Sequence, residues 1–555
     1  RMIASPAARR SWHPTSLLLV LSLGLATLGN LPLWNALWNL PEVHGPQAIA
    51  TLGALVLVVA AATMALLGLL LWPRWLKPAG PVLLTVTAAS SYFMASYGIV
   101  IDPSMLTNVV QTDTREALDL LAWPLLVTLA LGALLPGAWW WRQRLRPVGR
   151  VRLLAQQLGA VLAALLVAAV LLWLTFQDVA SLMRNHKTLR YMINPFNTVY
   201  AVGRVAVGRN AHAGKPLQPV GTDAQFAGTP AAADTAPLIV LVVGETARAA
   251  NFGLGGYERD TTPRLKTLQA QGDMVYFSDV SSCGTNTQTS VPCMFSPLGR
   301  QGYLDADGPY ENLLDVLQRA GLAVLWLDNQ SGCKGVCERV PALDTRALEH
   351  PTLCPDGQCL DEVMLRQLPE ALATLEPERR ARATVVVMHQ MGSHGPAYYK
   401  RSPATLKPFQ PECTSHALQE CPMEHIRNAY DNSLRYTDHF LAETVQWLQA
   451  QKRPTALMYV SDHGESLGEK GLYLHGMPYA MAPTEQTHVP MLVWMSKAMQ
   501  GERGQALDCL RRQADAPLSH DVLFPTMLDL AGVRTTALQP ERNLLAACPA
   551  RPAAG

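Results

Sequence analysis

The sequence has no cysteine before Cys283, and its formal net charge at pH 7 is only +2. Without cysteine, the front half of the chain can hold neither disulfides nor cysteine-ligated metals. Without an excess of positive charge, there is no reason to expect a nucleic acid as partner. The front half is rich in apolar residues instead, and the 49% hydrophobic content of this 555-residue chain is concentrated there.

Five long apolar stretches follow one another near the start, at residues 16–40, 49–72, 81–101, 120–141 and 153–176. Each is close to the roughly 20 residues that a helix needs to span a bilayer. One such stretch could be a buried helix of a soluble core, but five in succession predict five transmembrane helices. The first could also be a cleaved signal peptide. Its apolar run is long and no small-residue cleavage site stands out, so we interpret it as an anchor.

Arginine and lysine are confined to a few of the segments around these stretches. The other short loops are nearly free of positive charge, and positive residues favour the cytoplasmic side of a membrane. We therefore expect the C-terminal part to lie outside the cytoplasm. The residues that carry this orientation are Arg9, Arg10, Arg74, Lys77, Arg142, Arg144, Arg146, Arg150 and Arg152.

All ten cysteines lie in the part that is predicted to be outside. An even number of cysteines there indicates disulfides formed in an oxidising compartment. Zinc–cysteine sites are the alternative, but the spacings do not form paired CxxC motifs. Four pairs are neighbours in the sequence, and the last two cysteines are left to join each other. The predicted bonds are Cys283–Cys293, Cys333–Cys337, Cys354–Cys359, Cys413–Cys421 and Cys509–Cys548.

The composition divides the chain into three parts. Residues 1–177 form the predicted transmembrane domain of five helices. Residues 178–235 mix apolar and basic residues and then become rich in Ala, Gly and Pro, which is typical of amphipathic helices at a membrane surface followed by a linker. Residues 236–555 form a separate domain outside the membrane.

Short β-branched runs alternate with helical patterns in this last part. Strands are predicted at residues 238–243, 274–278, 322–327, 384–388, 455–460 and 489–494, and helices at 310–320, 360–373 and 424–451. This alternation predicts an α/β domain, with a mostly parallel sheet that helices cover on both faces. In such sheets, ligands bind at the carboxyl ends of the strands.

Polar side chains follow several of the predicted strands. Glu245 follows the first, residues 281–285 follow the second, His394 comes after the fourth, and Asp462 and His463 follow the fifth. Carboxylate and imidazole ligands suit zinc, or manganese where the ligands are harder. The plainer alternative is that Asp462 caps a helix and His463 lies at the surface. Glu245 at another strand end favours the metal site.

The segment SSCGTNTQTSVPCMFS, residues 281–296, places several hydroxyl groups behind a glycine and before a predicted helix. Backbone N–H groups at a helix N-terminus favour a phosphate, and a metal makes a nearby hydroxyl a stronger nucleophile. Spacing alone does not select one hydroxyl. The alternative is an ordinary turn that is rich in Ser and Thr.

Four segments together resemble the signature segments of bacterial lipid A phosphoethanolamine transferases, the family that includes the mobile colistin-resistance enzymes. The segments are VVGETARAANFGLGGYERDTTPRL, SSCGTNTQTSVPCMFS, MHQMGSHGPAYY and YVSDHGESLGEKGLYLHG. The resemblance covers nearly the whole chain. It implies a multi-pass protein of the bacterial inner membrane, with juxtamembrane helices and a periplasmic domain similar to sulfatases and alkaline phosphatases.

The resemblance also implies roles for individual residues. Thr285 is the expected nucleophile, and one tightly bound zinc ion is expected on Glu245, Thr285, Asp462 and His463, with a second ion possible and zinc preferred to manganese. His394 and His475 are expected at the phosphoryl group or a second metal, and either can act catalytically by protonating the leaving alkoxide or deprotonating the acceptor. The remaining roles are contacts to substrate: Lys334 at a phosphate, and Asn108, Thr112 and Glu116 in an outer loop that meets the lipid. For that loop the alternative is simple solvation.

The implied reaction moves phosphoethanolamine from phosphatidylethanolamine to a lipid A phosphate through an ester on threonine. Its product carries less negative charge, which implies resistance to polymyxins such as colistin. We expect a monomer among inner-membrane lipids. Three alternatives remain: transfer of phosphoethanolamine or phosphoglycerol to a core sugar or glycan, a periplasmic sulfatase or phosphodiesterase, and a non-catalytic sensor of lipid headgroups.

Overall fold

The computed structural model describes residues 11–41, 43, 45–111, 117–118, 120–212, 214–354, 357–504 and 506–546. The chain forms two compact units. The first comprises the described residues up to Leu106 together with Leu121–Val207. The second comprises those of Thr107–Leu120 and those from Gly208 onward.

The first unit is helical and includes the predicted spans. Its long helices are α1 (Pro14–Thr27) continued through η1 (Leu28–Asn30) into α2 (Leu31–Trp38), α3 (Pro46–Leu70), α4 (Pro73–Tyr97), α7 (Trp123–Leu129) continued through a π-helical turn into α8 (Leu135–Arg142), and α9 (Arg150–Leu174). Several of these helices begin at a proline, whose missing N–H is no loss in the first turn. The short helices α10 (Phe176–Asn185) and α11 (Phe196–His212) follow.

Four helical segments of the described chain are long and apolar enough to cross a membrane: Pro14–Trp38, Ala48–Leu70, Trp123–Arg142 and Arg150–Leu174. The predicted span 81–101 lies mostly in α4, a continuous helix of 25 residues that is not among these four. Its first turns carry Arg74 and Lys77, and its later turns carry several hydroxyl side chains, so it is less apolar than the others.

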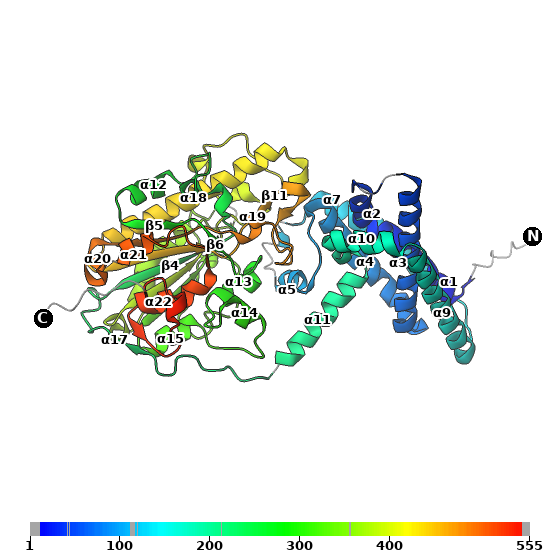
Figure 1. Cartoon of the computed structure of the whole chain (residues 1–555), viewed down its shortest axis with the longest axis horizontal. Helices are drawn as coiled ribbons and strands as arrows, with labels where there is room; N and C mark the ends of the chain where they lie inside the picture. The colour runs from blue at the N-terminus through cyan, green and yellow to red at the C-terminus, as the bar shows by residue number, and fades with distance from the viewer. Residues whose placement is uncertain are drawn as a thin grey trace, which may run out of the picture. The chain divides into compact units, whose positions relative to one another are not determined.

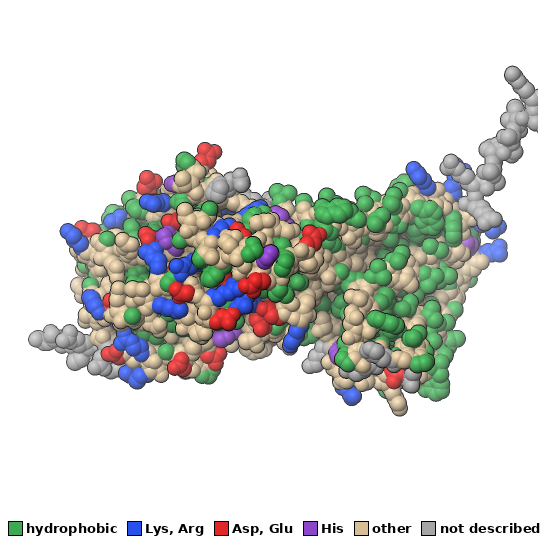
Figure 2. All heavy atoms as spheres, turned by 90° about the horizontal axis from the view of Figure 1, so that it is seen from above, with side chains coloured by type: hydrophobic (Ala, Val, Ile, Leu, Met, Phe, Trp, Pro, Cys, Tyr) green, Lys and Arg blue, Asp and Glu red, His purple; other side chains and the backbone are tan. Residues whose placement is uncertain are grey.

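The surface of the helical unit is that of a protein surrounded by lipid. Hydrophobic side chains cover much of the face seen in Figure 2, whereas charged side chains gather on the other unit. The most exposed large apolar residues include Trp173 at 79%, Leu174 at 65% and Leu166 at 66% on α9. Such contiguous apolar surface is stable only in contact with a membrane or a partner, in agreement with the predicted membrane domain.

The second unit is built on a seven-stranded sheet with the order β5-β13-β10-β4-β9-β7-β8. Its strands are β4 (Leu238–Gly244), β5 (Met274–Phe277), β7 (Ala323–Asp328), β8 (Ala342–Asp344), β9 (Thr384–His389), β10 (Thr455–Ser461) and β13 (Met491–Met495). Neighbouring strands are parallel except that β13 is antiparallel to both β10 and β5. The predicted α/β domain with a mostly parallel sheet is confirmed.

Helices cover both faces of this sheet (Figure 1). Alternate residues of β4 point to opposite layers, with Ile239, Leu241 and Val243 in one core and Leu238, Val240 and Val242 in the other. The first core includes α13 (Thr287–Met294), α15 (Leu313–Arg319), α21 (Ala506–Arg511) and α22 (Leu523–Leu530); the second includes α12 (Pro263–Ala270), α16 (Glu362–Ala373) and α18 (Met423–Gln449). Because both faces are buried, each central strand is apolar throughout.

The six predicted strands and three predicted helices of this unit are confirmed, with ends that differ by at most three residues. The short edge strand β8 was not predicted, because three residues give too little pattern. Four predicted disulfides are present: Cys283–Cys293, Cys333–Cys337, Cys354–Cys359 and Cys413–Cys421. Cys548 lies outside the described residues, so its bond to Cys509 stays a prediction.

Candidate metal centre and nucleophile

Glu245, Asp462 and His463 form a buried cluster at the carboxyl ends of two neighbouring strands. Ser461, the last residue of β10, pairs in register with Gly244, the last residue of β4, so the residues that follow them lie side by side. The three side chains are fully buried. One ligand atom from each lies within 4.8 Å of the other two, a spacing at which one ion can bind all three.

The electrostatics of this cluster favour a cation. Burial, followed by repulsion from Asp462, raises the pKa of Glu245 to about 8. Burial also raises the pKa of Asp462 to about 7. Among the described residues, Asp462 Oδ2 has no hydrogen-bond partner. Two desolvated carboxylates with an unsatisfied oxygen are costly without a positive charge between them, and a divalent ion supplies that charge.

His463 is oriented as a ligand. Its Nδ1 donates to the carbonyl oxygen of Gly464 at 2.9 Å, which leaves the lone pair of Nε2 toward the carboxylates. Nε2 lies 3.4 Å from Glu245 Oε1 and 3.4 Å from Asp462 Oδ2. Burial lowers the pKa of His463 to about 4, so the imidazole is neutral, as a metal ligand must be. Two carboxylates and one imidazole are a donor set that fits zinc.

The hydroxyl group beside this cluster belongs to Thr287. Its Oγ1 lies 3.3 Å and 3.2 Å from the two carboxylate oxygens of Glu245, and 3.4 Å from His463 Nε2. Thr287 is the first residue of α13, and Asn286 caps this helix by accepting a hydrogen bond from Thr289 N at 2.9 Å. The helix N-terminus therefore holds the Thr287 hydroxyl against two of the three candidate ligands.

Thr285 has different partners. Its Oγ1 donates to the carbonyl oxygen of Met477 at 2.7 Å, and its own carbonyl oxygen accepts from Gly476 N at 2.8 Å. No hydrogen bond within the described chain joins Thr285 to the three candidate ligands. The geometry therefore gives the place predicted for Thr285 to Thr287. The sequence held a signal for this: Asn is a preferred N-cap, so Asn286 directs the residue after it into the first helical turn.

His475 and His394 lie next to the cluster, as predicted. The ring centroid of His475 is 4.3 Å from that of His463 and 5.4 Å from that of His394. His475 Nδ1 is 2.8 Å from Glu465 Oε2, and the other oxygen of Glu465 accepts from the Tyr398 hydroxyl at 2.5 Å. Burial raises the pKa of Glu465 to about 8 and lowers that of His475 to about 4. The pair therefore holds one proton at neutral pH.

The loop after β9 runs close against Glu245. Ser393 N donates to the carbonyl oxygen of Glu245 at 3.0 Å. Gly392 has a φ of +51°, and a Cβ added there would lie 2.6 Å from that same oxygen. Only glycine permits both this backbone conformation and this approach. The same loop carries His394, so Gly392 helps to bring His394 to the cluster.

The other predicted substrate contacts are farther along the chain. Lys334 lies in the loop after β7, where its Nζ donates to Ser331 Oγ at 2.6 Å. This loop leaves the same edge of the sheet as the loops of the cluster, but no hydrogen bond or ion pair in the described part of the chain joins Lys334 to the cluster. Asn108 is half-buried in α5 (Pro103–Gln111). Thr112 and Glu116 lie outside the described residues.

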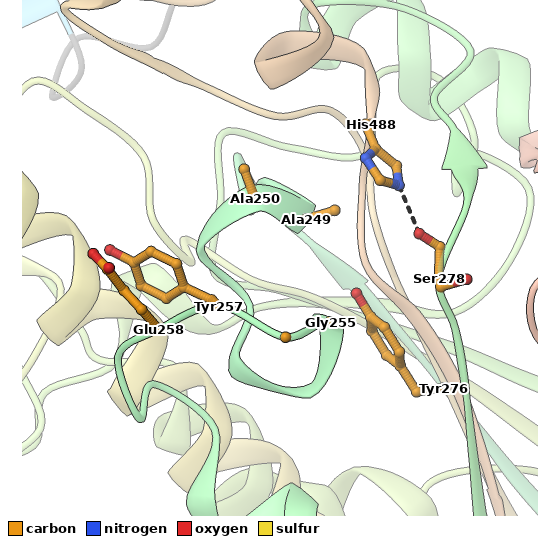
Figure 3. A pocket seen from close by; sticks show the side chains of 9 residues that line it. Ala249, Ala250, Gly255, Tyr257, Glu258, Tyr276, Ser278 and His488 are labelled. Atoms are coloured by element: carbon orange, nitrogen blue, oxygen red, sulfur yellow. Dashed lines mark hydrogen bonds between the residues drawn. The ribbon is translucent and has the colours of Figure 1, made fainter.

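A separate pocket of about 390 Å³ opens near the edge strand β5 (Figure 3). It is lined by Ala249, Ala250, Gly255, Gly256, Tyr257, Glu258, Tyr276, Ser278 and His488. The ring of His488 donates from Nε2 to the carbonyl oxygen of Ser278 at 2.8 Å. The candidate metal ligands do not line this pocket, so it is distinct from the cluster.

Comparisons with known proteins agree with the two-part architecture. The sulfatase family model matches residues 237–533, and the model of the phosphoethanolamine transferases EptA/EptB matches residues 59–209. Phosphoethanolamine transferase EptA of Salmonella typhimurium is 40% identical over 472 residues, which are 84% of each chain. Phosphatidylethanolamine transferase Mcr-2 of Escherichia coli is 36% identical over 552 residues, 95% of this chain and 96% of the relative.

The structural comparison extends over both units. The integral membrane lipooligosaccharide phosphoethanolamine transferase A of Neisseria meningitidis has a TM-score of 0.91 and 34% sequence identity. The match covers 98% of this chain and 100% of the other.

Proposed function

Because the chain belongs to the phosphoethanolamine transferase EptA family, we propose that it moves phosphoethanolamine from phosphatidylethanolamine to a phosphate of lipid A through a covalent ester on Thr287. The protein is a phosphoethanolamine transferase of the bacterial inner membrane with a periplasmic catalytic domain. The observation that carries the proposed mechanism is the position of the Thr287 hydroxyl, 3.2 Å from Glu245 and 3.4 Å from His463.

The candidate ligands fit zinc, and we propose that Glu245, Thr287, Asp462 and His463 hold one such ion. A zinc ion bound there would lower the pKa of the Thr287 hydroxyl and offset the negative charge on the phosphoryl oxygens. The buried carboxylates support this assignment, because burial raises the pKa of each and a nearby cation would lower it again. His475 and His394 are proposed to contact the phosphoryl group.

The reaction then consists of two displacements at phosphorus. In the first, Thr287 Oγ1 bonds to the phosphorus of the donor lipid, the bond from phosphorus to the glycerol oxygen breaks, and diacylglycerol leaves with a proton. In the second, an oxygen of a lipid A phosphate bonds to the same phosphorus, the bond from phosphorus to Thr287 Oγ1 breaks, and Oγ1 takes up a proton. The N–H groups at the start of α13 are proposed to stabilise the negative charge on the phosphoryl oxygens.

Proton transfer is assigned to the pair of His475 and Glu465. The pair holds one proton at neutral pH, and His475 is adjacent to His463. It can therefore give a proton to the leaving glycerol oxygen while it takes up the proton of the Thr287 hydroxyl, and in the second displacement it can return a proton to Thr287 Oγ1 and take one from the acceptor phosphate. Lys334, Asn108, Thr112 and Glu116 are proposed as contacts to the lipid headgroups.

The product has a physical consequence for the cell surface. Phosphoethanolamine adds an amine to a lipid A phosphate and so lowers its net negative charge. Cationic peptides such as polymyxins bind less well to such a surface. Expression of this chain is therefore proposed to raise resistance to colistin.

Mass spectrometry of lipid A tests the function directly. Cells that express the full chain should gain lipid A species heavier by one phosphoethanolamine group. Cells that carry the empty vector or the Asp462→Asn variant should not. A mass increase confined to the core sugars would instead support a transferase for the sugar part of the molecule. No modified lipid in any fraction would count against the transfer itself.

Replacement of His475 by glutamine tests the proton-transfer role. We expect kcat to fall by about 10²-fold to 10⁴-fold, the usual contribution of a general acid or base. KM for the donor lipid should change much less than kcat, because His394 and the other proposed contacts to the lipid are retained. His439→Gln is the matched control, since His439 lies on α18 beside Arg264 and Glu362. Equal loss of rate in both variants would contradict the assignment.

A further inference from the structure

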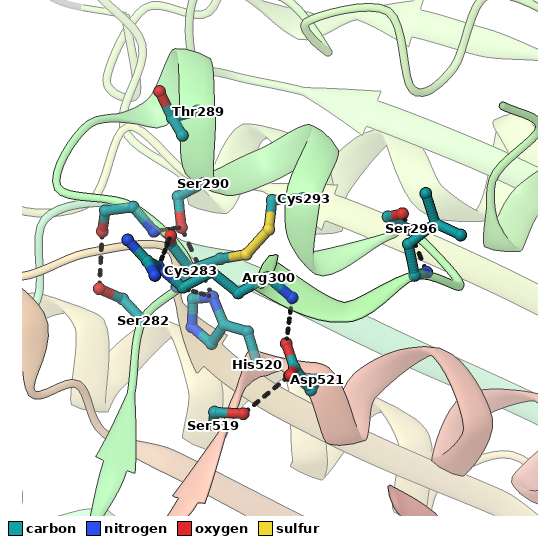
Figure 4. The surroundings of a disulfide bond; sticks show 12 residues. Ser282, Cys283, Thr289, Ser290, Cys293, Ser296, Arg300, Ser519, His520 and Asp521 are labelled. Carbon is teal, nitrogen blue, oxygen red and sulfur yellow. Dashed lines mark hydrogen bonds between the residues drawn. A yellow bond between two sulfur atoms is a disulfide. The ribbon is translucent and has the colours of Figure 1, made fainter. Parts of the chain in front are cut away.

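The segment that carries the nucleophile is held in place at Cys283 from several directions (Figure 4). A disulfide joins Cys283 to Cys293 on α13, the helix that begins with Thr287. The carbonyl oxygen of Cys283 accepts from Arg300 Nε at 2.9 Å. Its N–H group donates to His520 Nδ1 at 3.0 Å. His520 comes from a segment more than two hundred positions later in the chain.

A small parallel ladder brings His520 to this place. Strand β14 (Leu518–Ser519) pairs with β6 (Val280–Ser281), with Leu518 opposite Val280 and Ser519 opposite Ser281. The residue after β14 is His520, the first of the short helix η12 (His520–Val522). The Ser519 side chain caps this helix by accepting from Asp521 N at 3.3 Å. The register therefore sets His520 beside the start of the nucleophile segment.

The other ring nitrogen of His520 contacts β10, the strand that Asp462 and His463 follow. His520 Nε2 is 2.9 Å from the carbonyl oxygen of Ser461, the last residue of β10. Asp462 and His463 follow directly. The imidazole thus connects the backbone of Cys283, four residues before Thr287, with the backbone of Ser461, which directly precedes two candidate metal ligands.

The two hydrogen bonds define the state of the ring. The Cys283 N–H group can only donate, so Nδ1 accepts; the Ser461 carbonyl can only accept, so Nε2 carries the proton. His520 is 2% exposed, and burial lowers its pKa to about 4. The ring is therefore neutral and satisfied at both nitrogens at physiological pH.

Ser290 makes a parallel connection between the same two segments. Its Oγ donates to the carbonyl oxygen of Asp462 at 2.5 Å and accepts from Gly284 N at 3.3 Å. Its Oγ is also 3.5 Å from His520 Nδ1. The nucleophile segment and the end of β10 are thus linked by side chains as well as by the sheet.

We propose that His520 is a positioning residue for phosphoryl transfer, whose imidazole bridge between Cys283 and Ser461 fixes the distance from Thr287 to Asp462 and His463. This role rests on the proposed function. The hydrogen bonds of the parallel sheet fix β10 against β4, but Thr287 lies on α13 and outside the sheet. Its position relative to the ligands depends on connections such as this one. A displacement of about 1 Å between reacting groups costs roughly 10²-fold in rate.

Two variants separate the halves of the bridge. His520→Asn keeps an acceptor near the position of Nδ1 and loses the donor to Ser461, whereas His520→Gln can place an amide N–H near the position of Nε2. With the full chain in detergent, phosphatidylethanolamine labelled on its acyl chain and purified lipid A, we expect kcat to fall about tenfold to 10²-fold in both variants. KM for both lipids and the zinc content per chain should stay within about twofold of the unaltered protein.

Thr526→Val is the matched control. Thr526 is also buried, lies on α22 in the same C-terminal segment, and accepts from Leu544 N at 3.1 Å. Thr526→Val removes a buried hydrogen-bonding group away from the site, so it should lower the unfolding temperature without changing kcat.

The outcomes distinguish the role of His520 from the function itself. A kcat within twofold of the unaltered protein in both His520 variants would overturn the positioning role. A loss that merely follows lost zinc or lost folded protein, as in a structural residue, would overturn it too. Absence of transfer by the unaltered protein would overturn the proposed function and with it this role.

Discussion

Thr287→Ala is expected to abolish phosphoethanolamine transfer, whereas Thr285→Val should lower its rate by less than about tenfold. The Thr287 hydroxyl lies 3.2 Å from Glu245, and its removal leaves no oxygen to form the ester. Loss of a covalent nucleophile lowers kcat by on the order of 10⁴-fold to 10⁶-fold. Thr285→Val removes one hydrogen bond, to the Met477 carbonyl oxygen. Such a bond contributes about 1 kcal/mol. If all of it were lost from the transition state, kcat would fall by less than about tenfold.

The measurement is the release of labelled diacylglycerol by the purified full chain, combined with mass spectrometry of the intact protein. The unaltered protein and Thr285→Val should both accumulate a phosphoethanolamine adduct when the acceptor is left out, and peptide mapping should place it on Thr287. Thr287→Ser supplies a second control, because it keeps the hydroxyl group. An adduct on Thr285, or full activity of Thr287→Ala, would transfer the role back to Thr285.

Removal of the metal is expected to make the stability of the protein strongly dependent on pH. In the metal-free cluster, burial and repulsion from Asp462 raise the pKa of Glu245 from 4.5 to about 8, and burial raises that of Asp462 from 3.8 to about 7. A raised carboxyl pKa means that the folded state holds a proton that the unfolded state has lost. The extra protons bound by the folded state contribute to its free energy of unfolding. This contribution is complete below about pH 4 and is lost as the pH rises to about 8.

Thermal unfolding of the full chain checks this dependence. After treatment with a chelator, the unfolding temperature should fall between pH 5 and pH 8, and added zinc should restore it at pH 8. In Glu245→Gln, the neutral amide cannot ionise, so the fall should be smaller. It should not vanish, because Asp462 and Glu465 still titrate.

The same Glu245→Gln variant should purify with little zinc and lack transfer activity, since it loses one anionic ligand of the ion. Glu258→Gln is the matched control, because Glu258 lines the separate pocket and pairs with Arg427. Full zinc occupancy in Glu245→Gln, measured by elemental analysis, would contradict the ligand set. So would a metal-free protein whose stability does not change with pH.

Much of this architecture could be predicted because it depends on local pattern. The central strands are buried on both faces, so β4 and β10 are apolar over their whole length and stand out from the helices around them. Glu245, Asp462 and His463 could be grouped for the same reason. Parallel strands end at one edge, and residues that follow them meet there.

The identity of the nucleophile could not be obtained in this way. Thr285 and Thr287 are two positions apart, and spacing does not say which hydroxyl turns toward the metal ligands. The backbone of the segment decides it: Asn286 is extended, with φ of −152°, and Thr287 begins the helix. The contact between His520 and Cys283 could not be predicted either, since the two-residue strands that bring them together are too short to give a recognisable sequence pattern.

The sequence by itself determined the membrane helices, the α/β domain, four disulfides and the residue types of the candidate metal centre, because periodicity and strand ends express local preferences. Only the tertiary structure decided which threonine faces the candidate metal ligands and which distant histidine holds it there. Both depend on the relative placement of segments that are far apart in the chain. The N-cap preference of Asn286 indicates only where α13 begins, whereas the placement of this helix against the candidate ligands is set by packing and by hydrogen bonds between loops.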